Sequence, residues 1–160
     1  MKTSEQIVKK FGQQARVRVM GVLIREAKML LINHSGLNEE NELWLPPGGG
    51  VEFGENAIKC LEREFLEETN LVVTVGRMLF VNEFISDTIH AVELFFQIDD
   101  AKGVPRLGHD PELGDRQILV EMGFLSIDEV KNKGKNRVHR WLGRVNSFDE
   151  LLAQKGFFHF

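Results

Sequence analysis

The sequence is poor in cysteine, proline and tyrosine: its 160 residues include one cysteine, four prolines and no tyrosine. Because Cys60 has no second cysteine to pair with, an internal disulfide is excluded, and nothing indicates an oxidising compartment. No stretch approaches the roughly 18 consecutive apolar residues of a membrane-spanning helix. The polar N-terminal residues lack the apolar centre of a signal peptide. These absences predict a cytoplasmic protein with no membrane partner.

An excess of positive charge is also missing, since the formal net charge is −4. A partner such as DNA or RNA rewards a basic surface, so no polymeric nucleic acid is expected to bind. A small anionic substrate remains compatible, because a divalent metal can supply positive charge locally. No repeat or Pro/Ser-rich linker divides the chain, and we therefore expect a single domain over residues 1–160.

The pattern of apolar residues predicts strands before and after one regular helix. Residues 55–69 contain neither glycine nor proline and are typical of a helix, and a shorter helix is expected from Ile127, behind Ser126. This order predicts an α/β fold in which helices pack on a mixed sheet. The expected strands are 16–24, 29–32, 43–45, 71–84, 89–98 and 117–125; the remainder is an N-terminal arm or short helix (1–15), an irregular loop (99–115), and a C-terminal helix with an aromatic tail (135–160, helical over 137–154).

Three glutamates of the predicted helix fall on one side of it. At about 100° per residue, Glu64, Glu67 and Glu68 lie within one sector. Such carboxylates repel one another, and hard divalent cations relieve the repulsion by accepting oxygen ligands. Arg63 lies one turn before Glu67 and is expected to pair with it. A solvated charged surface is the alternative interpretation of this cluster.

A glycine run precedes the acidic helix. Gly48, Gly49 and Gly50 follow two prolines and carry no side chains, so the backbone there can approach a ligand closely. A carbonyl of this turn would serve as a further metal ligand, and its N–H groups could face phosphate oxygens. The glycine run at a fixed distance from the glutamates favours a ligand site over a solvated surface.

This segment resembles the Nudix box. That motif has a glycine, five residues, a glutamate, seven residues, and then Arg-Glu-hydrophobic-any-Glu-Glu-any-Gly-hydrophobic. The one departure is Asn70, where the family has its last glycine; the position is expected to need left-handed geometry, which asparagine tolerates. The matching positions here are Gly49, Glu55, Arg63, Glu64, Phe65, Glu67, Glu68 and Leu71.

The resemblance implies an α/β/α sandwich and hydrolysis of nucleoside diphosphates linked to another group. It implies that Glu64, Glu67 and Glu68 bind Mg²⁺ or Mn²⁺, completed by the carbonyl of Gly48 or Gly49. It also implies that Arg63 orients the glutamates while Glu55 supports the structure or acts as an outer ligand. Many members of the family use another carboxylate from a late loop. Glu112, and after it Asp110, are the candidates here, with a solvated turn as the alternative.

Further residues are candidates for contacts with a small nucleotide-like substrate. One arginine of the first strand, Arg18, is expected to bind phosphate, and Gly49 and Gly50 to approach the substrate. Trp44 would stack on a base, although a core position is the alternative for an aromatic at a strand end. The aromatic tail, Gly156–Phe160, is expected to dock on its own core or on a second copy in a homodimer.

The substrate is left open by the sequence. A nucleotide sugar, ADP-ribose and a (deoxy)nucleoside triphosphate all fit the implied chemistry. A non-catalytic Nudix-fold domain that senses a nucleotide or binds a protein is the alternative function. Such domains often lose box glutamates, and this chain keeps all of them.

Overall fold

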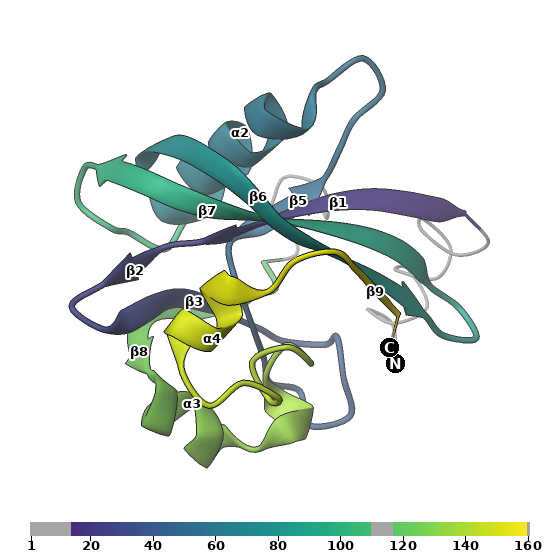
Figure 1. Cartoon of the computed structure of the whole chain (residues 1–160), viewed down its shortest axis with the longest axis vertical. Coiled ribbons are helices and arrows are strands. Elements are labelled where there is room, and N and C mark those ends of the chain that lie inside the picture. The colour runs from purple at the N-terminus through teal and green to yellow at the C-terminus, as the bar shows by residue number, and fades with distance from the viewer. Residues whose placement is uncertain (1–13, 110–116, 160) are drawn as a thin grey trace.

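The computed structural model describes residues 14–109 and 117–159, which form two sheets with helices around them (Figure 1). The five-stranded sheet has the order β5 (Gly48–Gly50), β1 (Ala15–Val22), β7 (His90–Lys102), β6 (Val72–Ile85), β9 (Phe157–His159). In the four-stranded sheet β3 (Lys28–His34) pairs with β2 (Ile24–Arg25), β4 (Leu43–Leu45) and β8 (Leu119–Ser126). The pairs β1–β7 and β6–β9 are parallel and the others antiparallel, which confirms the predicted mixed sheet.

The acidic helix predicted over 55–69 is α2 (Ala57–Thr69). It begins where the Asn56 side chain accepts the Lys59 N–H at 2.9 Å, because this cap satisfies a donor that has no partner within the helix. It ends at Asn70, whose φ of 60° is left-handed as predicted. Its apolar side packs on the sheet, where a Cβ on Gly21 would lie 2.3 Å from the Phe65 ring. Glycine at position 21 therefore lets the helix approach the sheet closely.

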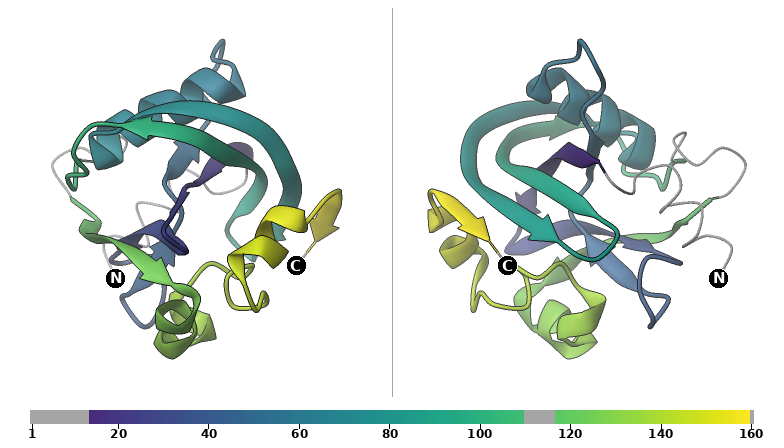
Figure 2. Two further views of the ribbon diagram at one scale, coloured as in Figure 1. Left: turned by 60° about the vertical axis from the view of Figure 1, so that its left-hand side comes forward. Right: turned by 90° about the vertical axis from the view of Figure 1, so that its right-hand side faces the viewer.

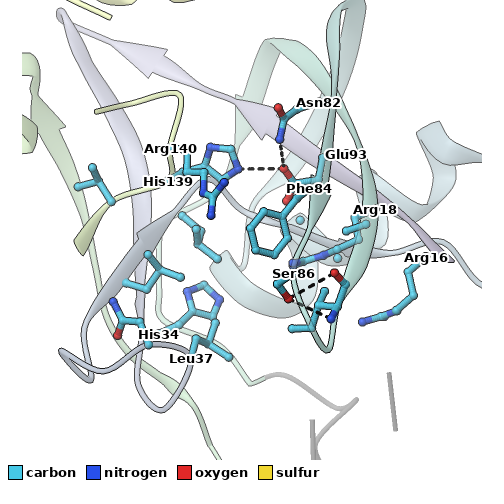
Figure 3. Close-up of a pocket in the computed structure, with 18 of the residues that line it drawn as sticks. Arg16, Arg18, His34, Leu37, Asn82, Phe84, Ser86, Glu93, His139 and Arg140 are labelled. Atoms are coloured by element: carbon cyan, nitrogen blue, oxygen red, sulfur yellow. Dashed lines mark hydrogen bonds and ion pairs between the residues drawn. The ribbon is translucent and has the colours of Figure 1, made fainter. Parts of the chain in front are cut away.

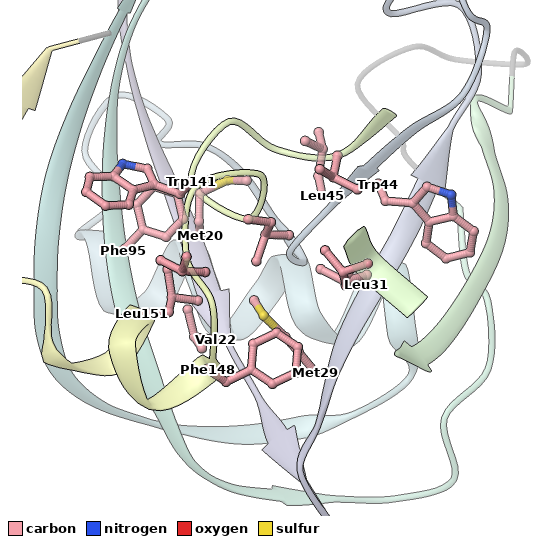
Figure 4. Close-up of a cluster of buried hydrophobic side chains, with 14 of the residues drawn as sticks. Met20, Val22, Met29, Leu31, Trp44, Leu45, Phe95, Trp141, Phe148 and Leu151 are labelled. Carbon is pink, nitrogen blue, oxygen red and sulfur yellow. The ribbon is translucent and has the colours of Figure 1, made fainter. Parts of the chain in front are cut away.

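The two faces of the five-stranded sheet have different neighbours (Figure 2). Val19 of β1 packs with the buried residues of α2, whereas the next residue, Met20, faces a second core formed with the other sheet. Figure 4 shows this second core, in which Met20 and Phe95 pack near Met29, Leu31 and Trp141. Since successive strand residues point to opposite faces, one strand serves both layers of the sandwich.

The C-terminal segment departs from the sequence prediction of a helix over 137–154. It contains α3 (Ile127–Lys133), the 3₁₀ helix η2 (Lys135–Arg137), turns, and the six-residue α4 (Phe148–Ala153). The prediction was wrong because long-range contacts hold this backbone: the His139 N–H donates to the Trp44 carbonyl at 2.9 Å. A new helix then starts at Ser147, whose hydroxyl accepts the Glu150 N–H at 3.1 Å.

The aromatic tail docks on its own molecule through β9. Phe158 packs against Trp141 and Phe80, with ring centroids 4.7 and 6.0 Å apart, while Phe157 is exposed. The arm was predicted over 1–15, but its last residue, Ala15, already belongs to β1. Residues 1–13 and the candidates Asp110 and Glu112 lie outside the described residues. Among the helices that are described, none has the length and apolar character needed to cross a membrane.

Candidate active site

A cavity of about 800 Å³ lies between the two sheets and is bordered by residues 135–144 (Figure 3). The five-stranded sheet contributes two rows of neighbouring residues to its lining. In the first row, Arg18 on β1 lies beside Glu93 on β7, which lies beside Asn82 on β6. The second row brings together Arg16, Ala91 and Phe84 on the same three strands. Laterally paired residues point to the same face, so both rows face the cavity.

Two glutamates of α2 reach this cavity past strand β5. Glu64 and Glu68 are 4% and 3% exposed and both line it. The Gly48 N–H donates to Glu68 Oε2 at 3.0 Å, and a Cβ on Gly49 would lie 2.3 Å from Glu64 Oε1. Gly49 therefore leaves the space that the Glu64 carboxylate occupies, and any side chain at position 49 would displace it.

Arg63 holds the acidic side chains in place. Its Nε and Nη2 donate to both carboxylate oxygens of Glu55 at 2.9 and 3.0 Å. Its Nη1 donates to Glu64 at 2.9 Å and to Glu67 at 3.2 Å, the second of which is the predicted pairing. Hydrogen bonding from Arg63 lowers the pKa of Glu55 to about 2, against the opposing effect of burial. Glu55 thus anchors the arginine that orients the helix glutamates.

Glu67 departs from the arrangement that its spacing predicts. Its side chain is 29% exposed, bonded to Arg63, and absent from the cavity lining. In the described part of the chain, no three His, Cys, Asp or Glu side chains come close enough together to hold a metal ion. The pair that the fold brings together is Glu64 and Glu68, beside the backbone of β5. Both carboxylates are buried, and they lie against backbone that has no space for a methyl group. Carboxylate oxygens are the donors that a hard divalent cation prefers.

The loop after β7 runs along the C-terminal end of α2. The Gly108 N–H donates to the Glu68 carbonyl at 2.8 Å, and the His109 N–H to the Glu67 carbonyl at 3.2 Å. A Cβ on Gly108 would lie 1.7 Å from the Glu67 carbonyl oxygen, so this contact requires glycine. The described part of the loop therefore ends beside α2 at His109, and the roles suggested for Glu112 and Asp110 stay predictions.

The cavity is richer in positive than in negative side chains, although the whole chain carries a net charge of −4. Arg18 is half-buried, and its Nε is buried without a hydrogen-bond partner among the described residues. A buried guanidinium nitrogen without an acceptor is costly unless a ligand supplies one. The local charge and this donor favour an anionic ligand. The basic residues of the lining are Arg16, Arg18, Lys135, Arg140 and Arg144, against Glu64, Glu68 and Glu93.

Three buried polar residues in the lining were missed by the sequence prediction. Glu93 Oε2 accepts hydrogen bonds from His139 Nε2 at 3.0 Å and from Asn82 Nδ2 at 2.9 Å (Figure 3). Burial alone would raise the pKa of Glu93, but His139, Arg18 and the Asn82 amide together lower it to about 2. In the sequence, Asn82 and Glu93 are each a polar residue within an apolar strand. This signal does not reveal that the two side chains meet in the folded protein.

The remaining candidates for substrate contacts differ in whether they line the cavity. Trp44 is 1% exposed, and its Nε1 donates to Glu42 at 2.8 Å, so its indole belongs to the core and does not line the cavity. Stacking of Trp44 on a base is thereby corrected in favour of the core alternative. Gly49 and Gly50 line the cavity, as does His34, whose pKa burial lowers to about 4.

Comparison with known proteins agrees with this geometry. A family model described as the NUDIX domain matches residues 14–142. A curated relative, ADP-ribose pyrophosphatase of Methanocaldococcus jannaschii, is 29% identical over 117 residues, covering 72% of this chain and 69% of its own length.

Solved structures share the fold. A MutT NUDIX hydrolase from Burkholderia pseudomallei superposes with a TM-score of 0.62 at 26% identity, covering 73% of this chain and 87% of the other. The E. coli ORF135 protein gives a TM-score of 0.66 at 19% identity, covering 88% and 92%. The family model spans most of the chain, and two box glutamates, Glu64 and Glu68, line one cavity beside the glycine strand. The protein therefore belongs to the Nudix family and is a Nudix hydrolase that cleaves pyrophosphate linkages.

Proposed function

We propose that this Nudix hydrolase cleaves the diphosphate of a nucleoside diphosphate derivative. ADP-ribose or a nucleotide sugar is the first candidate substrate, and a (d)NTP is the second. The proposed metal is Mg²⁺, with Mn²⁺ as a substitute. The observation that carries the proposal is that buried Glu64 and Glu68 share one cavity with Arg18. This arrangement suits a diphosphate, because the glutamates can hold a metal ion while the arginine contacts the phosphate oxygens. The name of the curated relative supports ADP-ribose as the first candidate.

The residues of the cavity fit a divalent cation. Glu64 and Glu68 would hold it, with a backbone carbonyl of Gly48 or Gly49 as a further ligand. Glu67 is the third candidate ligand, and it would join by turning from Arg63 at the exposed edge of the cluster. When bound, such a cation offsets the charge of the diphosphate and promotes attack by water on phosphorus.

The chain's own groups position the reactants. Arg63 fixes the rotamer of Glu64 through a 2.9 Å hydrogen bond, and is itself fixed by Glu55. Arg18 is the proposed donor to phosphate oxygens, since its buried Nε gains an acceptor when the substrate binds. Glu112 is proposed as the base that takes the proton of the attacking water. These roles place most of the rate enhancement in orientation and electrostatics.

The test is a phosphate-release screen over nucleotide sugars, ADP-ribose and (d)NTPs with wild type and Glu68→Gln. The amide keeps the size of the side chain and an acceptor for the Gly48 N–H but loses the charge, so we expect kcat/KM to fall roughly 100-fold or more. The matched control is Glu62→Gln, on the same helix and outside the cavity lining, which should stay within about 2-fold.

Thermal unfolding with added Mg²⁺ separates binding from folding. A ligand of the native state raises the melting temperature, so wild type should respond and Glu68→Gln should respond far less. Unchanged turnover in Glu68→Gln would remove this glutamate from the mechanism. Failure of wild type to hydrolyse any member of the panel would overturn the proposed function.

A further inference from the structure

Glu93 lies in the cavity two strands away from the glycine strand. With strands spaced about 4.8 Å apart, β7 lies roughly 10 Å across the sheet from β5, so Glu93 is far from the box glutamates. That separation is comparable to the length of a nucleoside. A substrate whose diphosphate lies at Glu64 and Glu68 would therefore extend its other end towards Glu93.

The hydrogen bonds of Glu93 use only one of its two carboxylate oxygens. The two donors, His139 Nε2 and Asn82 Nδ2, meet the same oxygen, Oε2. The second oxygen, Oε1, accepts no hydrogen bond within the described residues, although Glu93 lines the cavity. A carboxylate whose pKa is lowered to about 2 is ionised at neutral pH and can only accept. Glu93 is thus a fixed acceptor in need of a donor.

An aromatic ring lies beside this acceptor. Phe84 is in the next row of the same sheet, and in Figure 3 its ring points into the cavity below Glu93. The guanidinium of Arg140 lies 4.6 Å from the centroid of that ring. Flat groups of this kind stack on nucleobases, whose π-faces are all similar and give little selectivity. Selectivity must then come from the edge of the base, where Glu93 is placed.

We propose that Glu93 is a specificity-determining residue that accepts a hydrogen bond from the amino group of a nucleobase held at Phe84. This proposal rests on the proposed function and adds the class of base. Adenine, cytosine and guanine carry an amino group, whereas hypoxanthine and uracil present a carbonyl oxygen at the corresponding position. A carbonyl oxygen facing the Glu93 carboxylate would leave both acceptors unpaired and repelling each other.

The matched substrates are pairs in which a carbonyl oxygen replaces the amino group and the neighbouring ring nitrogen gains a hydrogen: ADP-ribose with its hypoxanthine analogue, and CDP-glucose with UDP-glucose. For the pair that wild type hydrolyses, we expect kcat/KM to favour the amino-bearing member at least about 10-fold. In Glu93→Gln the amide oxygen stays with the donors His139 and Asn82, so the NH2 group faces the base and the preference for the amino-bearing member should be lost or reversed. Phe84→Leu should raise KM for both members and leave their ratio unchanged, because it removes stacking alone.

The wild-type ratio tests the proposal without any variant. Equal rates for the two members of a hydrolysed pair would overturn the role of Glu93 while leaving the diphosphate hydrolysis intact. An equal loss for both members in Glu93→Gln would also overturn it, because Glu93 would then contact a part that they share, such as the sugar. Absence of hydrolysis of every diphosphate would instead be a failure of the proposed function.

Discussion

The two ends of the cavity are built in different ways. At the glutamate end (Gly48–Gly50, Glu64 and Glu68), the bonded groups Gly48 and Glu68 are only 20 positions apart. At the polar end (Arg18, Asn82, Glu93 and His139), each residue comes from a different strand or loop, and Glu93 and His139 are 46 positions apart. One end is specified by local spacing, the other only by the complete fold.

The ends also differ in how a carboxylate is held. Glu55 near the glutamate end is partly exposed and held by the two-pronged contact of Arg63, whereas Glu93 is buried between a histidine and an amide. Both have their pKa lowered to about 2. Loss of an exposed ion pair costs little stability, and loss of one partner in a buried pair costs much. We therefore expect substitutions at the glutamate end to impair activity and those at the polar end to impair stability as well.

The largest expected effect is on activity at the glutamate end, from Gly49→Ala. The new Cβ would lie 2.3 Å from Glu64 Oε1, so the carboxylate must move out of its buried position. A displacement of about 1 Å in a catalytic group costs on the order of 100-fold in rate, and we expect that loss in kcat/KM.

Unfolding in urea should show only a small change for Gly49→Ala, because the displaced group is the end of a flexible side chain. The control is Gly123→Ala, where the nearest atom, Leu125 Cδ2, would lie at an ordinary 3.8 Å and activity should be kept. If Gly49→Ala keeps full activity, the close fit between β5 and Glu64 has no catalytic meaning.

The same contrast explains what could be predicted from the sequence. The position of α2 and the Arg63–Glu67 pair follow from spacing within a few turns of helix. The left-handed end at Asn70 was expected from the resemblance, because the Nudix box has a glycine at that position. The partial exposure of Glu67 could not be predicted from spacing, because it depends on which carboxylates Arg63 binds in the folded protein.

The polar end could not be predicted, because nothing local indicates that Glu93 meets His139. The segment around His139 was predicted as helix since its composition permits one, yet its backbone is bonded to Trp44 from a distant strand. Trp44 itself belongs to the core for the same reason: tertiary packing, and not position beside the glycine run, determines where the indole lies.

The next effect is on stability at acid pH, through Glu93. Its pKa in the folded protein is lowered from 4.5 to about 2, so the stability it contributes is present above about pH 4.5 and is lost as the pH falls towards 2. The shift corresponds to roughly 3 kcal/mol. Urea unfolding of wild type and Glu93→Gln at several pH values should give curves that converge over this interval.

The comparison for Glu93→Gln is Glu55→Gln. The folded pKa of Glu55 is also about 2, but its side chain is 18% exposed and solvent screens part of the interaction. We therefore expect a smaller acid-dependent loss at position 55. Parallel curves for wild type and Glu93→Gln would show that the buried network contributes no pH-dependent stability.

The smallest effect concerns Asn70, the one departure from the box pattern. Alanine tolerates left-handed backbone less well than asparagine and lacks the side-chain hydrogen bond of Asn70, so Asn70→Ala should lower the free energy of unfolding by about 1 kcal/mol. Asn132→Ala, at an exposed helical asparagine, should stay within about 0.5 kcal/mol. Asn70→Gly relieves the strain but loses the 3.2 Å bond from Nδ2 to the Val104 carbonyl, and these should nearly cancel. A loss above about 1 kcal/mol in Asn70→Gly would show that this bond, which ties the loop after β7 to the end of α2, outweighs the strain that glycine relieves.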